Sequence, residues 1–269
     1  MGGATLACLP AHLAACLLIR EPAEKTACVH ALWREWRAGS VAAAVDAPRT
    51  PIGQPGRPDR PQLVAPQQVP RRPADTVAGR AALIHALAHI EFTAINLALD
   101  AAHRFGGMPP DYYADWLRVA DEEATHFELL REHIHTLGHD YGDFTAHNGL
   151  WEMALKTAND PLVRMALVPR VLEARGLDAT PLIIDKLRRA RDLRAIEILE
   201  IIERDEIGHV AIGSRWFDWL CAERGLSPDA TFRQLLAEYD APPLKPPFNF
   251  EARRQAGFSP NELDWLRTL

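Results

Sequence analysis

Glutamate and histidine occur three residues apart at three places in the chain, a spacing that suits metal binding. The pairs are Glu123/His126, Glu132/His135 and Glu206/His209. In an α-helix, residues i and i+3 project from the same side about one turn apart, so both side chains can bind one ion. A single pair is weak support, since a chain with 18 glutamates and 11 histidines gives about one by chance. The neighbouring residues must therefore decide which pairs are functional.

Helical phase separates two of these pairs from the third. The apolar residues around Glu123 are Trp116, Val119, Ala120 and Phe127, and those around Glu206 are Leu199, Ile202 and Val210. Glu132 follows Glu123 by nine residues, about half a turn around the helix, and so faces the opposite side. We expect Glu123/His126 and Glu206/His209 to point into a core and Glu132/His135 to face solvent.

Two further glutamates interrupt apolar stripes. Glu91 lies in the stripe formed by Leu83, Ile84, Leu87, Ile90, Ala94, Ile95 and Ala98, and Glu173 lies between Leu172 and Leu177. An unpaired carboxylate on a buried face costs several kcal/mol unless it is neutralised or coordinates a metal. The buried glutamates therefore need a common explanation.

Spacing along the chain supplies this explanation. Glu91 and Glu123 are 32 residues apart with the break Gly106–Pro110 midway, and Glu173 and Glu206 are 33 apart with a plausible turn at Arg189–Ala190. Two antiparallel helix pairs would bring the carboxylates of each pair to the same height. One Glu from each of two helices and Glu-x-x-His from two others is the ligand set of di-iron and di-manganese carboxylate bundles.

The predicted ligands of two metal ions are thus Glu91, Glu123, His126, Glu173, Glu206 and His209. Four carboxylates with two neutral imidazoles balance two divalent cations and suit iron, manganese or a mixed pair better than a thiolate zinc site. An alternative remains open in which Arg170 or Arg175 neutralises the glutamates and the histidines are packing residues.

Other residues are candidates for supporting roles. Asp205 could accept the ring N–H of a ligand histidine as an outer-shell carboxylate, and His147 and Trp151 could cover the pocket. Pro169, four residues before Glu173, removes a helix hydrogen bond and should distort the helix there. Such distortions often accompany metal or substrate sites.

Helical periodicity and breaks predict an all-α protein in which a four-helix bundle positions these residues. We expect an N-terminal helical extension (1–45), a connector with eight prolines in residues 46–73 that extends to residue 74, the bundle (75–225) and a C-terminal helical tail (226–269). Helices are expected from an N-cap at Asp75 to residue 105, at 110–138, from 161 onwards and at 192–220. Residues 139–160 form a long crossover. The tail should have helices at 228–240 and after the capping box that starts at Ser259.

Composition favours an ordinary soluble globular protein with 48% hydrophobic and 25% charged residues. The net charge of -6 gives no broad basic field, so we do not expect nucleic acid as a partner. No C-x-x-C spacing joins Cys8, Cys16, Cys28 and Cys221, so we expect reduced thiols in a cytoplasmic protein. No segment shows the roughly 18 apolar residues of a membrane span.

The chain resembles a ferritin-like bacterial family catalogued as domain of unknown function 455. The resemblance covers roughly residues 75–260 and depends on segments 88–91, 98–105, 122–127, 141–152, 169–178 and 204–211. It implies the ferritin-like bundle with its dinuclear site, matched at all six positions, and no settled reaction. A di-iron hydroxylase that modifies tRNA is similar more distantly.

These observations predict a di-iron oxidoreductase that uses O2 or peroxide to oxidise or hydroxylate a small organic substrate. An external electron donor could be a further partner, and we expect a monomer or homodimer. Two alternatives remain. One is metal handling by a ferroxidase or storage protein, and the other is hydroxylation of tRNA.

Overall fold

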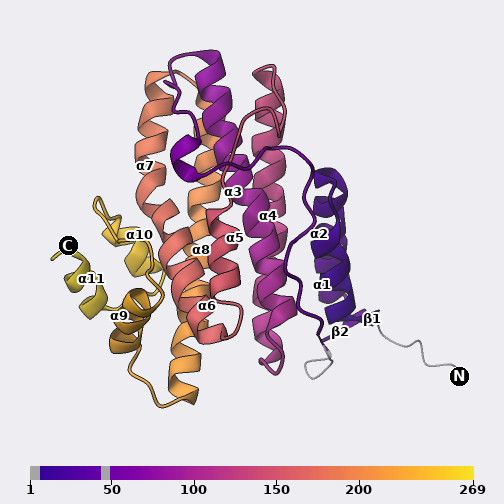
Figure 1. The fold of residues 1–269 in the computed structure, drawn as a ribbon, viewed down its shortest axis with the longest axis vertical. Helices are drawn as coiled ribbons and strands as arrows, with labels where there is room; N and C mark the ends of the chain where they lie inside the picture. The colour runs from indigo at the N-terminus through magenta and orange to yellow at the C-terminus, as the bar shows by residue number, and fades with distance from the viewer. Residues whose placement is uncertain (1–6, 44–48) are drawn as a thin grey trace, which may run out of the picture. The chain divides into compact units, whose positions relative to one another are not determined.

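The computed structural model describes residues 7–43 and 49–269, whose regular secondary structure is almost wholly helical (Figure 1). The prediction of an all-α protein is confirmed for these residues. Their one sheet is a short parallel pair, β1 (Ala7–Cys8) with β2 (Val41–Ala42). Parts of the predicted extension and connector, residues 1–6 and 44–48, lie outside the described residues. The chain forms two compact units, described in turn below, and the predicted domain limits remain predictions.

The first unit contains the chain up to Arg72 together with Ala81–Asn148. Its elements are α1 (Leu9–Leu18), α2 (Pro22–Arg37), the short 3₁₀ turn η1 (Pro66–Gln68), most of α3 (Val77–Arg104) and α4 (Pro110–Thr136). Helix α2 packs against both α1 and α4. The predicted break between α3 and α4 is present, and Gly107 has a φ of +71° there, a conformation that favours glycine.

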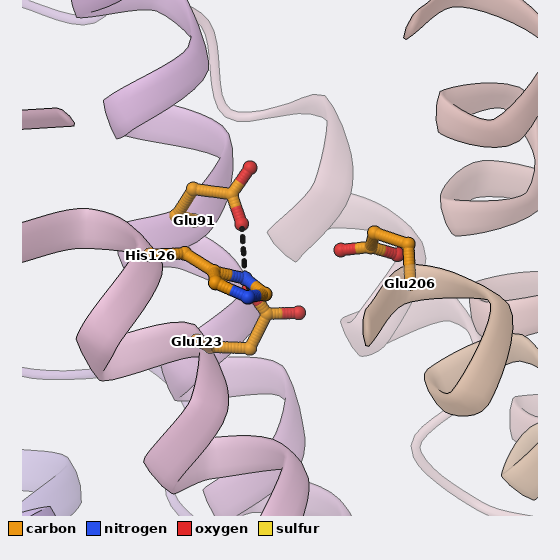
Figure 2. A group of neighbouring side chains, drawn as sticks. All are labelled: Glu91, Glu123, His126 and Glu206. Carbon is orange, nitrogen blue, oxygen red and sulfur yellow. Dashed lines mark hydrogen bonds and ion pairs between the residues drawn. The ribbon is translucent and has the colours of Figure 1, made fainter. Parts of the chain in front are cut away.

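The buried faces of α3 and α4 largely match the predicted apolar stripes. All five residues predicted for the apolar face of α4 are buried, namely Trp116, Val119, Ala120, Phe127 and Leu130. On α3, Ile84 and Ile95 are buried, and Glu91, which is drawn in Figure 2, lies between them in sequence. Ile90 was assigned wrongly, because it is 43% exposed. It lies about 100° around the helix from Glu91, at the edge of the stripe.

Helix α3 is also apolar and long enough to cross a membrane, which corrects the expectation that no segment reaches that length. Its most apolar 18-residue window has a mean hydropathy of 1.5, and 67% of that window is buried inside the protein. A core helix that is covered on most sides has the same composition. The burial of α3 is consistent with a soluble protein.

Cys16 and Cys28 form a disulfide between α1 and α2, so the expectation of four reduced cysteines was wrong for this pair. The short link between the helices brings the two Cα atoms to 5.7 Å, although the residues are 12 apart in sequence. Lys25 reinforces the hairpin, since its buried Nζ donates to the backbone oxygen of Leu17 at 2.8 Å and to Asn96 Oδ1 at 2.8 Å. Burial lowers the pKa of Lys25 to about 7.

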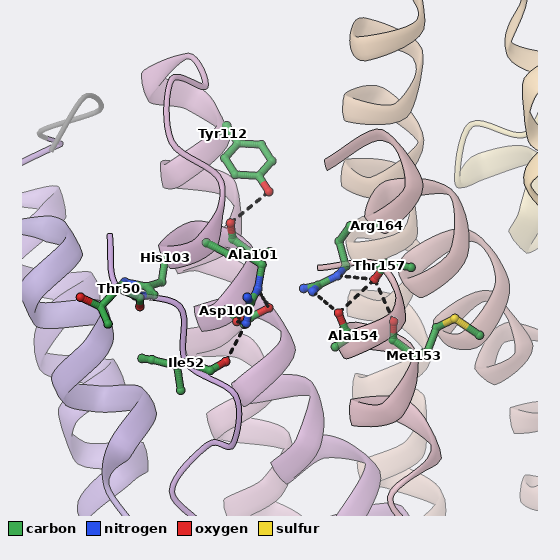
Figure 3. Close-up of polar contacts among 11 residues, drawn as sticks. Thr50, Ile52, Asp100, Ala101, His103, Tyr112, Met153, Ala154, Thr157 and Arg164 are labelled. Atoms are coloured by element: carbon green, nitrogen blue, oxygen red, sulfur yellow. Dashed lines mark hydrogen bonds and ion pairs between the residues drawn. The ribbon is translucent and has the colours of Figure 1, made fainter. Parts of the chain in front are cut away.

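The described part of the proline-rich connector up to Arg72 belongs to the first unit and contacts the end of α3. Arg104, at the end of α3, donates from Nη2 to the backbone oxygen of Ile52 at 2.7 Å. The ring of His103 contacts the backbone oxygen of Thr50 at 3.0 Å (Figure 3). These side chains satisfy carbonyls that a proline-rich segment cannot pair within itself.

The second unit contains Pro73–Arg80 and Gly149–Leu269. Its elements are the first turn of α3, then α5 (Gly149–Lys156), α6 (Pro161–Leu167), η2 (Val168–Glu173), α7 (Ala174–Arg189), α8 (Leu193–Glu223), α9 (Pro228–Glu238), α10 (Phe250–Gln255) and α11 (Pro260–Leu266). Helix α8 packs against α6, η2, α7, α9 and α10. Two of these helices, α5 in the crossover and α10 in the tail, were not predicted.

The capping box predicted at Ser259 is present, and Asp160 and Asp192 also cap helices. Side-chain oxygens of Asp160, Asp192 and Ser259 accept backbone N–H groups at the starts of α6, α8 and α11. The predicted cap of α3 is one residue off, because the helix begins at Val77 and Thr76 Oγ1, not Asp75, accepts the backbone N–H of Gly79 at 3.0 Å. Asp and Thr are both good cap residues, so sequence alone did not distinguish them.

The helix distortion predicted at Pro169 is confirmed. Residues Val168–Glu173 form a π-helical segment, η2, between the α-helical α6 and α7. Proline cannot donate the backbone hydrogen bond that a regular α-helix needs at this position. Helix α8 approaches very closely here, since a Cβ added at Gly213 would lie 2.3 Å from Pro169 Cγ. The last residue of the π-helical segment is Glu173, and the segment packs closely against α8.

Candidate metal site

Three of the six predicted ligands come together in the first unit. Glu91 on α3 and Glu123 and His126 on α4 are all buried, with at most 4% exposure. Figure 2 shows their polar ends turned toward one another. His126 Nδ1 lies 3.4 Å from Oε2 of both glutamates, and one ligand atom from each residue lies within 4.8 Å of the others. The three side chains can meet because Glu91 on α3 lies at the same height along the two helices as Glu123 and His126 on α4.

Electrostatics disfavour an ionised carboxylate at Glu91 in the absence of a cation. Burial, followed by the charge of Glu123, raises the pKa of Glu91 well above its ordinary value. The hydrogen bond and charge of His126 oppose this shift without cancelling it. Two buried carboxylates thus face one imidazole. A bound cation would reverse this cost.

Tyr141 and His89, which contact each other, were not predicted as functional candidates. The ring of Tyr141 contacts Phe92 and Phe127, with centroids 5.5 and 5.1 Å away, and these directly follow Glu91 and His126 in sequence. His89 Nε2 faces the backbone oxygen of His147 at 3.1 Å and so carries the proton. His89 Nδ1 therefore accepts the Tyr141 hydroxyl at 2.8 Å.

Burial keeps this histidine neutral. It lowers the pKa of His89 to about 4, more than its hydrogen bond to the His147 carbonyl raises it. Burial also raises the pKa of the Tyr141 phenol. His89 precedes Glu91 by two residues on the same helix, and residues two apart do not share a face, so this spacing was no signal of where His89 lies. No spacing rule connected it to Tyr141, which lies in the crossover.

The other three predicted ligands lie in the second unit. Glu206 and His209 are one turn apart on α8, with His209 Nδ1 3.6 Å from Glu206 Oε1. His209 is fully buried, and the side chain of Glu206 is 13% exposed. Glu206 is the fourth residue labelled in Figure 2. Glu173 ends the η2 segment, which packs on α8, and its side chain is partly buried.

The alternative in which arginines neutralise the glutamates is not what the structure shows. Arg170 Nη2 contacts Glu262 Oε1 at 2.6 Å, and both side chains are buried. Arg175 Nη1 contacts Asp178 Oδ2 at 3.6 Å. The carboxylate partners of both arginines are therefore outside the predicted ligand set.

The third Glu-x-x-His pair faces solvent, as predicted. Glu132 and His135 on α4 are exposed, and His135 Nε2 contacts Asp140 Oδ1 at 2.8 Å. The difference from Glu123 and His126 follows from helical phase alone, because both pairs have the same spacing on one helix. This pair gives a natural control for metal binding.

The three residues predicted to support the site, Asp205, His147 and Trp151, differ in their contacts and burial. Asp205 is held by Arg204, whose Nε donates to Asp205 Oδ1 at 2.8 Å. The side chain of His147 is exposed, whereas Trp151 on α5 is buried. The outer-shell role of Asp205 and the pocket role of His147 and Trp151 remain predictions.

The donor set of the first unit fits a divalent transition metal. It offers carboxylate oxygens and one imidazole nitrogen with no thiolate, a combination that suits iron or manganese. The buried, charge-disfavoured carboxylate of Glu91 is a group that a cation would stabilise. The same donor types recur at Glu206 and His209 in the second unit.

Comparisons with known proteins identify a matching family and a similar protein. The family model described as protein of unknown function (DUF455) matches residues 18–264, a range that includes all six predicted ligands. An uncharacterized protein of Haemophilus influenzae is 55% identical over 216 residues, which make up 78% of this chain and 75% of that protein. No solved structure matches the chain. The match over most of its length shows that the chain belongs to the DUF455 family.

Proposed function

We propose that the chain is a ferritin-like four-helix bundle that binds two metal ions, most simply iron, and acts as an oxidoreductase. In this proposal the ligands are Glu91, Glu123, His126, Glu173, Glu206 and His209. The observation that carries the proposal is the convergence of two buried carboxylates and a buried imidazole in the first unit. Buried charge of this kind is retained where it is paired or coordinates a metal.

Two features of the second unit support the proposal. The Glu206/His209 pair repeats the spacing of Glu123/His126 and has its imidazole buried. A π-helical segment ends on Glu173, and such segments occur frequently at functional sites. With both sets of residues bound to the same pair of ions, four carboxylates and two neutral imidazoles would balance the charge of two divalent cations.

Within this proposal the residues of the chain hold the ions and exclude bulk water. Two bound irons would supply the redox chemistry that lets O2 or peroxide oxidise or hydroxylate a small organic substrate. Burial of Glu91, Glu123 and His126 keeps competing water away and strengthens their charge interactions. We propose further that the protein is a cytoplasmic monomer or homodimer that receives electrons from an external donor.

Iron binding tests the proposal directly. Metal-free protein is titrated anaerobically with Fe²⁺, and two equivalents per chain should bind. Exposure to oxygen should then change the visible absorption spectrum. The matched variants are Glu123→Ala with His126→Ala and Glu132→Ala with His135→Ala, which remove the same residue types from one helix.

Only the first double variant should lose Fe²⁺ binding and the oxygen-dependent spectrum. Equal losses in both variants, or no Fe²⁺ binding by the wild-type chain, would contradict the proposed site. Binding of two irons without any oxygen-dependent change would retain the metal site and remove the oxidoreductase proposal.

A further inference from the structure

The guanidinium of Arg170, in the middle of η2, is enclosed by the C-terminal part of the chain. Its Nη2 donates to Glu262 Oε1 at 2.6 Å, and Arg170 is 1% exposed. Its carbon lies 4.6 Å from the ring centre of Phe232 and 4.9 Å from that of Phe258. A buried charge that contacts a buried carboxylate holds both elements in one geometry, because losing the partner is very costly.

Glu262 is fixed from its other side as well. Its Oε2 accepts the backbone N–H of Ser259 at 2.8 Å, while its own N–H donates to Ser259 Oγ at 3.1 Å. This capping box starts α11, so one carboxylate both caps the last helix and binds Arg170. The position of α11 is thereby tied to the position of η2.

A second buried arginine, on α10 in the C-terminal part of the chain, forms hydrogen bonds with the first turns of α7. Arg253 on α10 donates from Nε and Nη2 to the two carboxylate oxygens of Asp178 at 2.9 and 2.7 Å. Its Nη2 also reaches the backbone oxygen of Ala174 at 3.4 Å. The ring of Phe258 lies against both guanidiniums, 4.9 Å from Arg170 and 5.0 Å from Arg253.

These contacts bracket Glu173 in sequence. Arg170 precedes it by three residues, Ala174 follows it directly, and Asp178 follows it by five. The apolar cluster of the tail also contains Ala174 and Val210, the residue after His209. A π-helical segment is a rare interruption of the regular α-helical hydrogen bonding, so contacts outside it help to hold its end in place.

We propose that residues 249–266, here called the C-terminal segment, position Glu173 for metal binding through Arg170 and Asp178. This inference depends on the proposed function and extends it by assigning Arg170, Arg253 and Glu262 as positioning residues. The Glu173 carboxylate would reach its metal only while the C-terminal segment is docked. A purely structural role would affect folding but leave the metal affinity of the folded protein unchanged.

Glu262→Gln is the sharpest perturbation, because glutamine can still form the capping box while Arg170 loses its carboxylate. The matched control is Asp264→Asn, two residues on in the same helix, which breaks an exposed ion pair with Arg267. Mn²⁺ binding is measured by calorimetry under conditions where circular dichroism shows both variants folded. The visible spectrum of bound Co²⁺ reports the ligand geometry in parallel.

In Glu262→Gln, one of the two Mn²⁺ equivalents should bind about 10- to 100-fold more weakly, the range seen when outer-shell partners of ligands are removed. The Co²⁺ spectrum should change with it, and Asp264→Asn should match wild type in both measurements. Unchanged affinity and spectrum in folded Glu262→Gln would overturn the positioning role. No Mn²⁺ binding by wild type would instead overturn the proposed function itself.

A reciprocal measurement on the wild-type chain keeps the test valid if Glu262→Gln does not fold. Coupling between two sites is symmetric in free energy, so metal binding must stabilise the docked C-terminal segment if that segment favours metal binding. Hydrogen exchange is followed for amides in residues 253–263 with and without saturating Mn²⁺. Slower exchange with metal supports the coupling, and identical exchange in protein that binds two Mn²⁺ refutes it.

Discussion

Replacing Glu91 with glutamine should stabilise the metal-free protein, although it removes a predicted ligand. Glu91 is 4% exposed, and burial together with Glu123 raises its pKa well above 4.5, its ordinary value. At pH 7 the unfolded chain carries this charge, and folding must either bury the charge or protonate the carboxylate. Glutamine has the same shape and cannot ionise, so Glu91→Gln avoids both costs.

The magnitude has a ceiling that follows from the ordinary pKa. Protonating a carboxyl at pH 7, which is 2.5 units above 4.5, costs about 3.4 kcal/mol at about 1.36 kcal/mol per unit. Keeping Glu91 ionised cannot cost more than protonating it. We therefore expect Glu91→Gln to raise the free energy of unfolding of metal-free protein by about 1–3 kcal/mol at pH 7.

The sign of the pH dependence follows from the direction of the shift. With a raised folded pKa, the folded state binds more protons than the unfolded state above pH 4.5, so wild-type stability falls as pH rises. The advantage of Glu91→Gln should therefore be absent near pH 4 and grow toward pH 7. The assay is urea unfolding of chelator-treated protein across this range, with exposed Glu132→Gln as the control.

Added Mn²⁺ should reverse the order, because a ligand at 100 times its Kd stabilises the folded state by about 2.7 kcal/mol. Wild type should gain this stabilisation and Glu91→Gln should gain much less. The reasoning is wrong if metal-free Glu91→Gln is less stable than wild type at pH 7. It is also wrong if the difference between them does not depend on pH.

Two further predictions concern packing and charge elsewhere in the units. The hydrogen bond to Asp121 raises the pKa of His30. His30 should therefore stabilise the fold below pH 6.5, and this stabilisation should disappear as pH rises through the raised folded pKa. His30→Gln should cost about 0.5–1 kcal/mol at pH 5.5 and almost nothing at pH 9 in urea unfolding, and an equal cost at both would contradict this. Gly213→Ala should lower the free energy of unfolding by about 1–3 kcal/mol, because its Cβ would overlap Pro169. Gly176→Ala, with nothing within 4 Å, should gain up to about 1 kcal/mol, and similar thermal shifts in both would refute the packing argument.

The long helices could be predicted because their sequences repeat apolar residues over many turns. Helix α4 shows this best, since the same periodicity placed Glu123 in the core and Glu132 in solvent. Helices α5 and α10 have eight and six residues, too few for a reliable period. The N-cap of α10 was the available signal, because Asn249 Oδ1 accepts the backbone N–H of Ala252 at 3.1 Å.

The candidate site could be predicted in part for a similar reason. Glu91, Glu123 and His126 were identifiable because each is a polar residue on an apolar stripe, and two helices of matched length bring them together. Contacts that depend on loop geometry were not predictable. Tyr141 reaches His89 from the crossover, and Glu262 reaches Arg170 across 92 residues of sequence. No local sequence pattern predicts either of these two contacts.

The disulfide between α1 and α2 has a consequence for proteolysis. Arg20 lies in the link between these helices with an exposed side chain, so trypsin can cut after it. The peptide that ends at Arg20 carries Cys16 and would stay bonded to Cys28 on the larger fragment. Such a nicked molecule keeps its full mass on a non-reducing gel and separates into two bands only when a thiol is added.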